Sequence, residues 1–169
     1  AGYSYNYQYV HLTSLSAVSL PTDIWYPTTN IAKPQRGWQG SLGYFKNFKQ
    51  NMFETSVELY YKGMNNLIEY KEGALPGDNV NDNTDNLLVF GKGQSYGAEF
   101  FIKKTAGSFT GWIGYTISKT TRTFDDLNNG EPFAAKYDRR HDLSIVASYK
   151  LNKRWIFSSA FIFATGNTL

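Results

Sequence analysis

The chain has no cysteine among its 169 residues, and no stretch approaches the roughly 18 consecutive apolar residues that a membrane-spanning helix needs. The lack of cysteine excludes disulfide frameworks, thiolate metal sites and thiol nucleophiles. The lack of a long apolar run excludes a helical membrane protein. The formal net charge is only +3, and the basic residues form no dense run. A nucleic-acid partner is therefore not expected, because nucleic acids are recognised by clustered Lys and Arg.

Aromatic residues are abundant, with 13 Tyr and 12 Phe, and many of them recur at a period of two. Between residues 107 and 118, the odd positions include Phe109, Ile113 and Tyr115, whereas the even positions are mostly Ser, Thr and Gly. Residues 53–61 alternate in the same way. Because successive side chains of a strand point to opposite faces, each segment has one apolar face and one mostly polar face.

This alternation predicts seven strands. Their expected ranges are 2–11, 36–46, 51–71, 91–104, 107–120, 139–151 and 153–164. Ten strand residues at about 3.3 Å each, tilted near 45°, span roughly 23 Å, which is close to the height of the apolar band of an outer-membrane barrel. Strands of ordinary globular proteins are shorter, with about five or six residues.

The connections between these segments are alternately short and long. The short turns are 46–51, 104–107 and 150–154, and the long connections are 12–35, 72–90 and 121–138. All five prolines fall in the long connections, where no ladder hydrogen bond is lost. Such sorting indicates one rim of short periplasmic turns and one rim of long external loops. Charge is sorted as well, because six of the 17 Lys and Arg residues lie at the short turns, where no acidic residue is found, while most acidic residues lie in the long loops.

The pattern therefore predicts an all-β fold, specifically an antiparallel up-and-down transmembrane β-barrel, with residues 1–169 as part of one barrel domain. Seven strands do not close such a barrel, so the chain is expected to be a fragment of a larger one. Five aromatics are interpreted as lipid-facing or interfacial: Trp38, Tyr44, Tyr149, Trp155 and Phe163. Two alternatives stay open: a soluble secreted β-sandwich that binds carbohydrate, and a small complete barrel with a structural role.

Several segments resemble the carboxy-terminal part of the barrel in TonB-dependent outer-membrane receptors. They read LPTDIWYPTTNIAKPQ, SVELYYKGMNNLIEYKEGA, GKGQSYGAEFFIKKTAGSFTGWIGYTISKTTRTFDD and KYDRRHDLSIVASYKLNKRWIFSSAFIFATGN. The most specific parts are Gly97-Ala98-Glu99, the Trp-Ile-Gly-Tyr-Thr run at 112–116, and Tyr137-Asp138-Arg139-Arg140-His141-Asp142. The resemblance covers nearly the whole chain and is strongest over 36–167.

This resemblance implies nutrient uptake across the bacterial outer membrane through a barrel of about 22 strands, plugged by an amino-terminal domain and energised by TonB. The implied partners are outer-membrane lipid, the plug, the TonB system and a surface lipoprotein. Neither enzymatic activity nor a cofactor is expected. The plug, the TonB box and the final strands are not recognisable in this sequence. The substrate, which such receptors draw from siderophores, cobalamin, glycans and peptides, is not specified.

Two clusters are candidates for ligand contact. Asp23, Trp25 and Tyr26 lie between prolines in the first long loop, where an aromatic platform could stack on a sugar or another flat ligand. Packing of these aromatics against the barrel wall or the plug is the alternative. The second cluster contains Tyr137 and Arg140 at the start of the sixth expected strand.

The parity of the sixth expected strand sends Asp138 and Arg140 to the same side as Asp142, which is the lumen side. Ligand contact is one interpretation of this cluster. The alternative is a rim network of ion pairs, whose other members would be Glu54, Glu58, Glu99 or Lys62.

Catalysis and metal binding have little support. His141 and Asp142 are adjacent, and adjacent strand residues point to opposite faces, so they are not expected to form a catalytic dyad. A hydrolase built on His141 or His11 with a serine would lack a Gly-x-Ser-x-Gly motif. Loop 78–86 carries Asp and Asn side chains that could bind calcium, but it lacks the spacing of a helix-loop-helix calcium site. A solvated external loop is the simpler interpretation.

Overall fold

The computed structural model describes residues 1–13, 24–73 and 84–166. The seven long strands are β1 (Gly2–Gln8), β4 (Gln35–Phe48), β5 (Phe53–Tyr70), β6 (Leu88–Lys104), β7 (Phe109–Phe124), β9 (His141–Lys150) and β10 (Ile156–Ala164). The shorter elements are β2 (Val10–Thr13), β3 (Ile24–Pro27), β8 (Phe133–Ala134) and the 3-10 turns η1 (Thr84–Leu87) and η2 (Asn128–Gly130). Within these ranges, no helix is long and apolar enough to cross a membrane.

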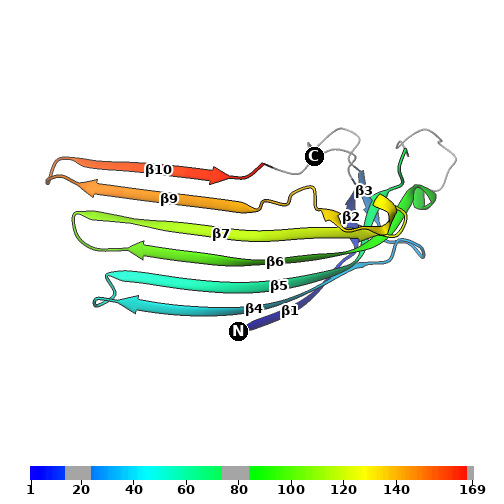
Figure 1. Ribbon diagram of the computed structural model, residues 1–169, viewed down its shortest axis with the longest axis horizontal. Coiled ribbons are helices and arrows are strands. Elements are labelled where there is room, and N and C mark those ends of the chain that lie inside the picture. Colours follow the sequence, from blue (N-terminus) through cyan, green and yellow to red (C-terminus); the bar gives the residue numbers. More distant parts are fainter. Residues whose placement is uncertain (14–23, 74–83, 167–169) are drawn as a thin grey trace.

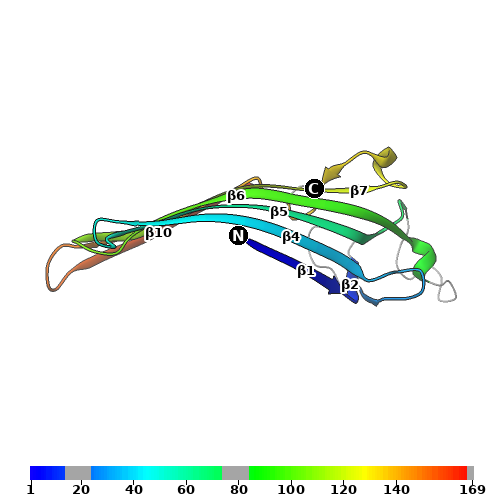
Figure 2. The same cartoon turned by 90° about the horizontal axis from the view of Figure 1, so that it is seen from below.

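The seven long strands form one sheet in the order β1-β4-β5-β6-β7-β9-β10, and every neighbouring pair is antiparallel. The β4–β5, β6–β7 and β9–β10 turns lie together at one end, and the long connections lie at the other end (Figure 1). Seen from the side, the long strands make a single curved layer (Figure 2). β1 pairs only with β4 and β10 only with β9, so the described sheet is open.

The prediction of an all-β, antiparallel fold is confirmed, and the long strands lie within a few residues of the expected ranges. The first strand differs. The expected strand 2–11 is divided at Tyr9 into β1 and β2, and β2 pairs with β3 in a separate two-stranded sheet. A hydrogen bond from the Thr28 backbone nitrogen to the Tyr9 carbonyl oxygen, at 3.0 Å, fixes the point where the chain leaves the large sheet. The first long connection therefore contains ordered strand.

The buried hydrophobic clusters of the described residues lie at the long-loop end, where β5 and β6 extend beyond β4. A bulge at Asn66, which has a φ of +57°, shifts the β5–β6 register by one residue. Beyond the bulge, Leu67 packs with residues of β6, β7 and the η2 region, namely Val89, Phe124 and Leu127. Ile68 points to the opposite side, where it packs with Tyr70, Leu88 and Tyr26. The extension is thus covered on one side by the η2 region and on the other by the β2–β3 hairpin.

One close approach between strands depends on a glycine. Gly111 of β7 has a φ of +154°, and a Cβ atom at this position would overlap the carbonyl oxygen of Val146 in β9. Because both the backbone angle and the space exclude a side chain, β7 and β9 can pair at this point only with glycine.

Candidate functional site

The register of the seven strands places the alternating residues of every strand on a common face. One line of directly opposed residues runs through Leu42, Leu59, Ala98 and Ile117, and a second runs through Tyr44, Val57, Phe100, Tyr115, Leu143 and Phe163. We call this side of the sheet the apolar face. Its large side chains are not covered: Leu42 is 62% exposed, Phe100 43% and Phe161 54%. A continuous hydrophobic surface of this extent is unusual on a protein in water.

Few charged residues lie on the apolar face. In the seven long strands they are Lys46 and Lys104 toward the short turns, and Arg36, Lys92 and Lys119 toward the long loops. From Arg36 to Lys46 is ten residues of β4, or about 33 Å of strand at about 3.3 Å per residue. At a tilt of about 40°, this uncharged band is about 25 Å high, which equals the apolar band of transmembrane barrels.

The opposite side, which we call the polar face, has a different composition. Ser4, Asn6 and Gln8 of β1 lie beside Gln35 and Gln39 of β4, and with Lys62 they line a hollow of about 220 Å³. Nearer the short turns, Lys103 forms an ion pair with Glu54 across the β5–β6 ladder at 3.2 Å.

The polar face also carries a few apolar residues. The rings of Phe101 and Trp112 lie 6.0 Å apart, beside Gly114. Val146 lies opposite Trp112 on β9. This small aromatic patch lies toward the short-turn end of an otherwise mainly polar surface.

The candidates Trp25 and Tyr26 take different positions. Asp23 lies outside the described residues. Trp25 is 65% exposed, whereas the neighbouring Tyr26 packs on the cluster of Ile68, Tyr70 and Leu88. Adjacent strand residues point to opposite sides of the β2–β3 hairpin, so the two rings cannot form one stacking platform. Trp25 alone stays available for ligand contact.

Asp85 joins the first and second long connections through a contact that the sequence pattern does not predict. The Tyr26 hydroxyl donates to its Oδ1 at 2.8 Å, and the Thr29 hydroxyl donates to the same oxygen at 2.9 Å. The Asp85 side chain is buried. Two effects raise the pKa of Tyr26 to about 12: burial of the ring, which is the larger, and its hydrogen bond to Asp85. Asp85 therefore holds the hairpin onto the extension of β5 and β6.

The second candidate cluster is a turn that lies along the edge of β7. β9 begins at His141, so the strand parity that sends Asp138 and Arg140 to the lumen does not apply to residues 136–140. Asp138 is buried, accepts a hydrogen bond from the Thr120 backbone nitrogen and forms an ion pair with Arg140 at 3.6 Å. Tyr137 is 61% exposed. The partner of Arg140 is thus local, rather than Glu54, Glu58 or Glu99.

The side chains of the two histidines do not meet each other, and neither of them meets the side chain of Asp142. His141 lies on the apolar face, where its Nδ1 is 2.8 Å from the Tyr115 hydroxyl, while Asp142 lies on the polar face opposite Thr116. The geometry agrees with the expectation that they form no dyad. His11 is fully buried, and neither ring nitrogen has a hydrogen-bond partner among the described residues. Burial lowers the pKa of His11, so its neutral form is favoured.

The possible calcium loop is described only in part, because residues 78–83 lie outside the described residues. Asp85 already accepts hydrogen bonds from Tyr26 and Thr29. Residues 1–13, 24–73 and 84–166 contain no group of three or more His, Cys, Asp or Glu side chains placed to hold a metal ion.

No protein-family model, curated protein or solved structure matches this chain. The two faces of the sheet and the sequence resemblance are therefore the basis for inferring a function.

Proposed function

We propose that this sheet is part of the wall of a transmembrane β-barrel in the bacterial outer membrane, and that the barrel is a TonB-dependent receptor for nutrient uptake. The observation that carries the proposal is the uncovered apolar face, with its uncharged band about 25 Å high. β9 and β10, with ten and nine residues, have the length of membrane-spanning strands. Further strands would pair with β1 and β10, because open strand edges are not stable in lipid.

The polar face would line the lumen, and the long-loop end would face outward. The hollow between β1 and β4 and the exposed ring of Trp25 are the ligand-contact candidates that this arrangement favours. Uptake energised by TonB rests on the sequence resemblance. It predicts that cells without TonB and cells without this protein lose uptake of the same nutrient.

The soluble β-sandwich is less well supported. A sandwich buries the apolar face of one sheet against a second sheet, about 10 Å away. The two-stranded β2–β3 sheet contacts the extension of β5 near Ile68 and Tyr70, beyond most of the apolar face. Leu42, Phe100 and Phe161 are therefore left without a covering layer.

The membrane proposal can be tested on one strand with two adjacent single-cysteine variants, because the chain has no other cysteine. Ser56 lies on the polar face and Val57 on the apolar face of β5. Each variant, S56C or V57C, is labelled with a small fluorophore and reconstituted in vesicles with brominated acyl chains. We expect the V57C label to be quenched by the lipid and the S56C label by an aqueous quencher.

A protein that stays folded and monomeric without detergent would contradict the membrane proposal, and so would equal lipid quenching at both positions. A V57C label that reaches neither quencher would place the apolar face against another sheet, as the sandwich requires.

A further inference from the structure

The short-turn end of the sheet concentrates positive charge without acidic residues. Six cationic residues lie in or next to the three turns: Lys46, Lys49, Lys104, Lys150, Lys153 and Arg154. No Asp or Glu occurs in residues 46–53, 104–109 or 150–156. The nearest carboxylate, that of Glu54, is paired with Lys103. The excess charge is therefore not neutralised within this rim.

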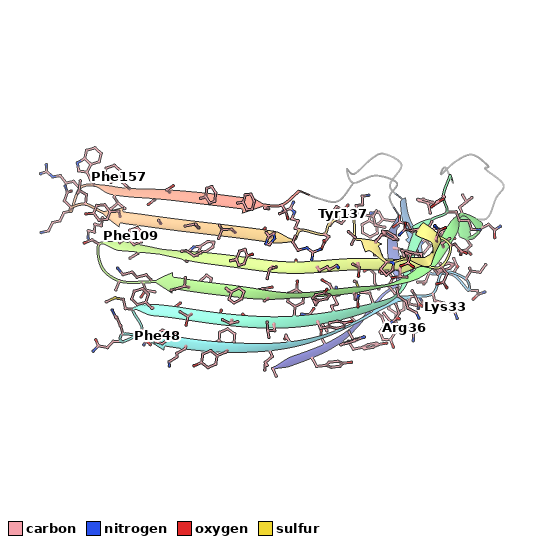
Figure 3. All side chains as sticks on the ribbon, viewed as in Figure 1. Lys33, Arg36, Phe48, Phe109, Tyr137 and Phe157 are labelled. Carbon is pink, nitrogen blue, oxygen red and sulfur yellow. The ribbon has the colours of Figure 1, made fainter. Side chains whose placement is uncertain are left out.

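Three of these lysines lie over phenylalanine rings. The Nζ atom of Lys46 is 5.0 Å from the centre of the Phe48 ring, that of Lys49 is 5.9 Å from Phe53, and that of Lys104 is 6.0 Å from Phe109. The strand register places Phe48, Phe53 and Phe109 on the apolar face. Figure 3 shows Phe48, Phe109 and Phe157 at the short-turn end, far from Arg36 and Tyr137.

Lys46 and Lys104 lie within strands at the edge of the apolar face, and not in a solvated turn. Both belong to the apolar face, in the last rows before the chain turns. A lysine at the edge of such a face extends its aliphatic stem along the apolar surface and places its ammonium group at the polar boundary. Aromatic rings occupy the same boundary in membrane proteins.

We infer that this rim, defined by Lys46, Lys49 and Lys104 with their phenylalanine rings, binds the phosphate groups of anionic phospholipids. The inference rests on the proposed function, because it requires the apolar face to lie in a bilayer. Anionic headgroups complement six cations that have no acidic neighbours, and each cation near a membrane surface strengthens that attraction. The partner surface is thus the lipid leaflet that meets the short turns.

The test uses the protein reconstituted in phosphatidylcholine vesicles that contain spin-labelled phosphatidylglycerol or spin-labelled phosphatidylcholine. Electron paramagnetic resonance separates lipids held at the protein surface from bulk lipids. We expect phosphatidylglycerol to be held roughly threefold more strongly than phosphatidylcholine, and the preference to weaken in high salt. In the triple variant K46Q/K49Q/K104Q, which removes three of the six cations, the preference should fall clearly below that of the unchanged protein.

The matched control is K33Q/K62Q/K71Q, which removes the same charge from positions away from the short turns. Its lipid preference should stay close to that of the unchanged protein. Equal loss in both triple variants would assign the preference to net charge and overturn the inference, as would no loss in the rim variant.

The result also separates this inference from the proposed function. If neither lipid shows a surface-held population, the sheet is not in the bilayer and the proposed function fails. If both lipids are held equally by the unchanged protein, the membrane wall stands and only the rim inference fails. If the rim variant loses binding to soluble polyglutamate and keeps its lipid preference, the partner is an acidic protein and the lipid inference is wrong.

Discussion

At the scale of single residues, Asp85 determines how the first long connection is held. Asn at this position keeps the size of the side chain and removes the charge that accepts two hydroxyl hydrogen bonds. We expect D85N to loosen the β2–β3 hairpin by about 1–3 kcal/mol, because hydrogen bonds to charged groups are lost. Proteolysis of the hairpin should accelerate while β6 and β7 stay protected. D125N, at an exposed position, is the control and should leave the rate unchanged.

The same contact gives an alkaline pH dependence. The pKa of Tyr26 is about 12 in the folded protein, against 10.0 for a free tyrosine, so its contribution to stability is complete below pH 10. That contribution is lost as the pH rises from about 10 to about 12. NMR titration of ring-labelled tyrosine, with the signal assigned by Y26F, should give a lower pKa in D85N. The pKa should stay above 10.0, because burial is the larger cause of the shift. An unchanged pKa in D85N would contradict the role of Asp85.

His11 makes the stability of the hairpin depend on pH in the acidic range. Burial lowers its pKa, so the unfolded hairpin binds a proton more readily than the folded one. Stability should therefore fall as the pH drops through about 6.5, the ordinary histidine value. H11L should remove this loss and leave stability at neutral pH equal or higher, because both buried ring nitrogens lack partners among the described residues. Hairpin proteolysis against pH measures this. H141Q is the control and should keep the acid sensitivity.

At the scale of the strands, Gly111 tests the pairing of β7 with β9. A methyl group there would overlap the Val146 carbonyl and would need a φ that alanine rarely adopts. We expect G111A to cost about 1–3 kcal/mol or more, measured as a lower denaturant midpoint. G40A is the matched control, because a Cβ atom at Gly40 meets nothing within 4 Å. A smaller effect for G111A than for G40A would show that β7 and β9 do not pair in this register.

The long strands could be predicted because each of them contains many consecutive alternations of apolar and polar residues. The β2–β3 hairpin was not, because its four-residue strands give too few alternations and one ends at Pro27. Its position depends on contacts with Ile68 and Asp85, which are distant in sequence. Similarly, the predicted lumen position of Arg140 assumed that strand parity began before His141, whereas a turn held by Asp138 precedes β9.

At the scale of the whole molecule, the sheet has an apolar face and a polar face, and it has short turns at one end and long connections at the other (Figure 1). The sequence pattern predicted the alternation within each strand, but only the register shows that the apolar residues of seven strands share one side. The register also shows that few charged residues lie on this side. These two facts turn a general preference for β-structure into a proposal for where a bilayer would lie.

A pair of arginine substitutions at one depth tests that position. Ile145 lies midway along the apolar face of β9, and Ser144 is its neighbour on the polar face. We expect I145R to destabilise the protein in vesicles by about 2–4 kcal/mol and S144R by clearly less, because only the first places a charge in lipid. Tyr149, nearer the short turns, supplies the decisive third position, and Y149R should cost only about 0–1 kcal/mol. A buried protein core penalises charge without such a gradient toward a headgroup boundary, so equal costs at Ile145 and Tyr149 in denaturant titrations would contradict the membrane position.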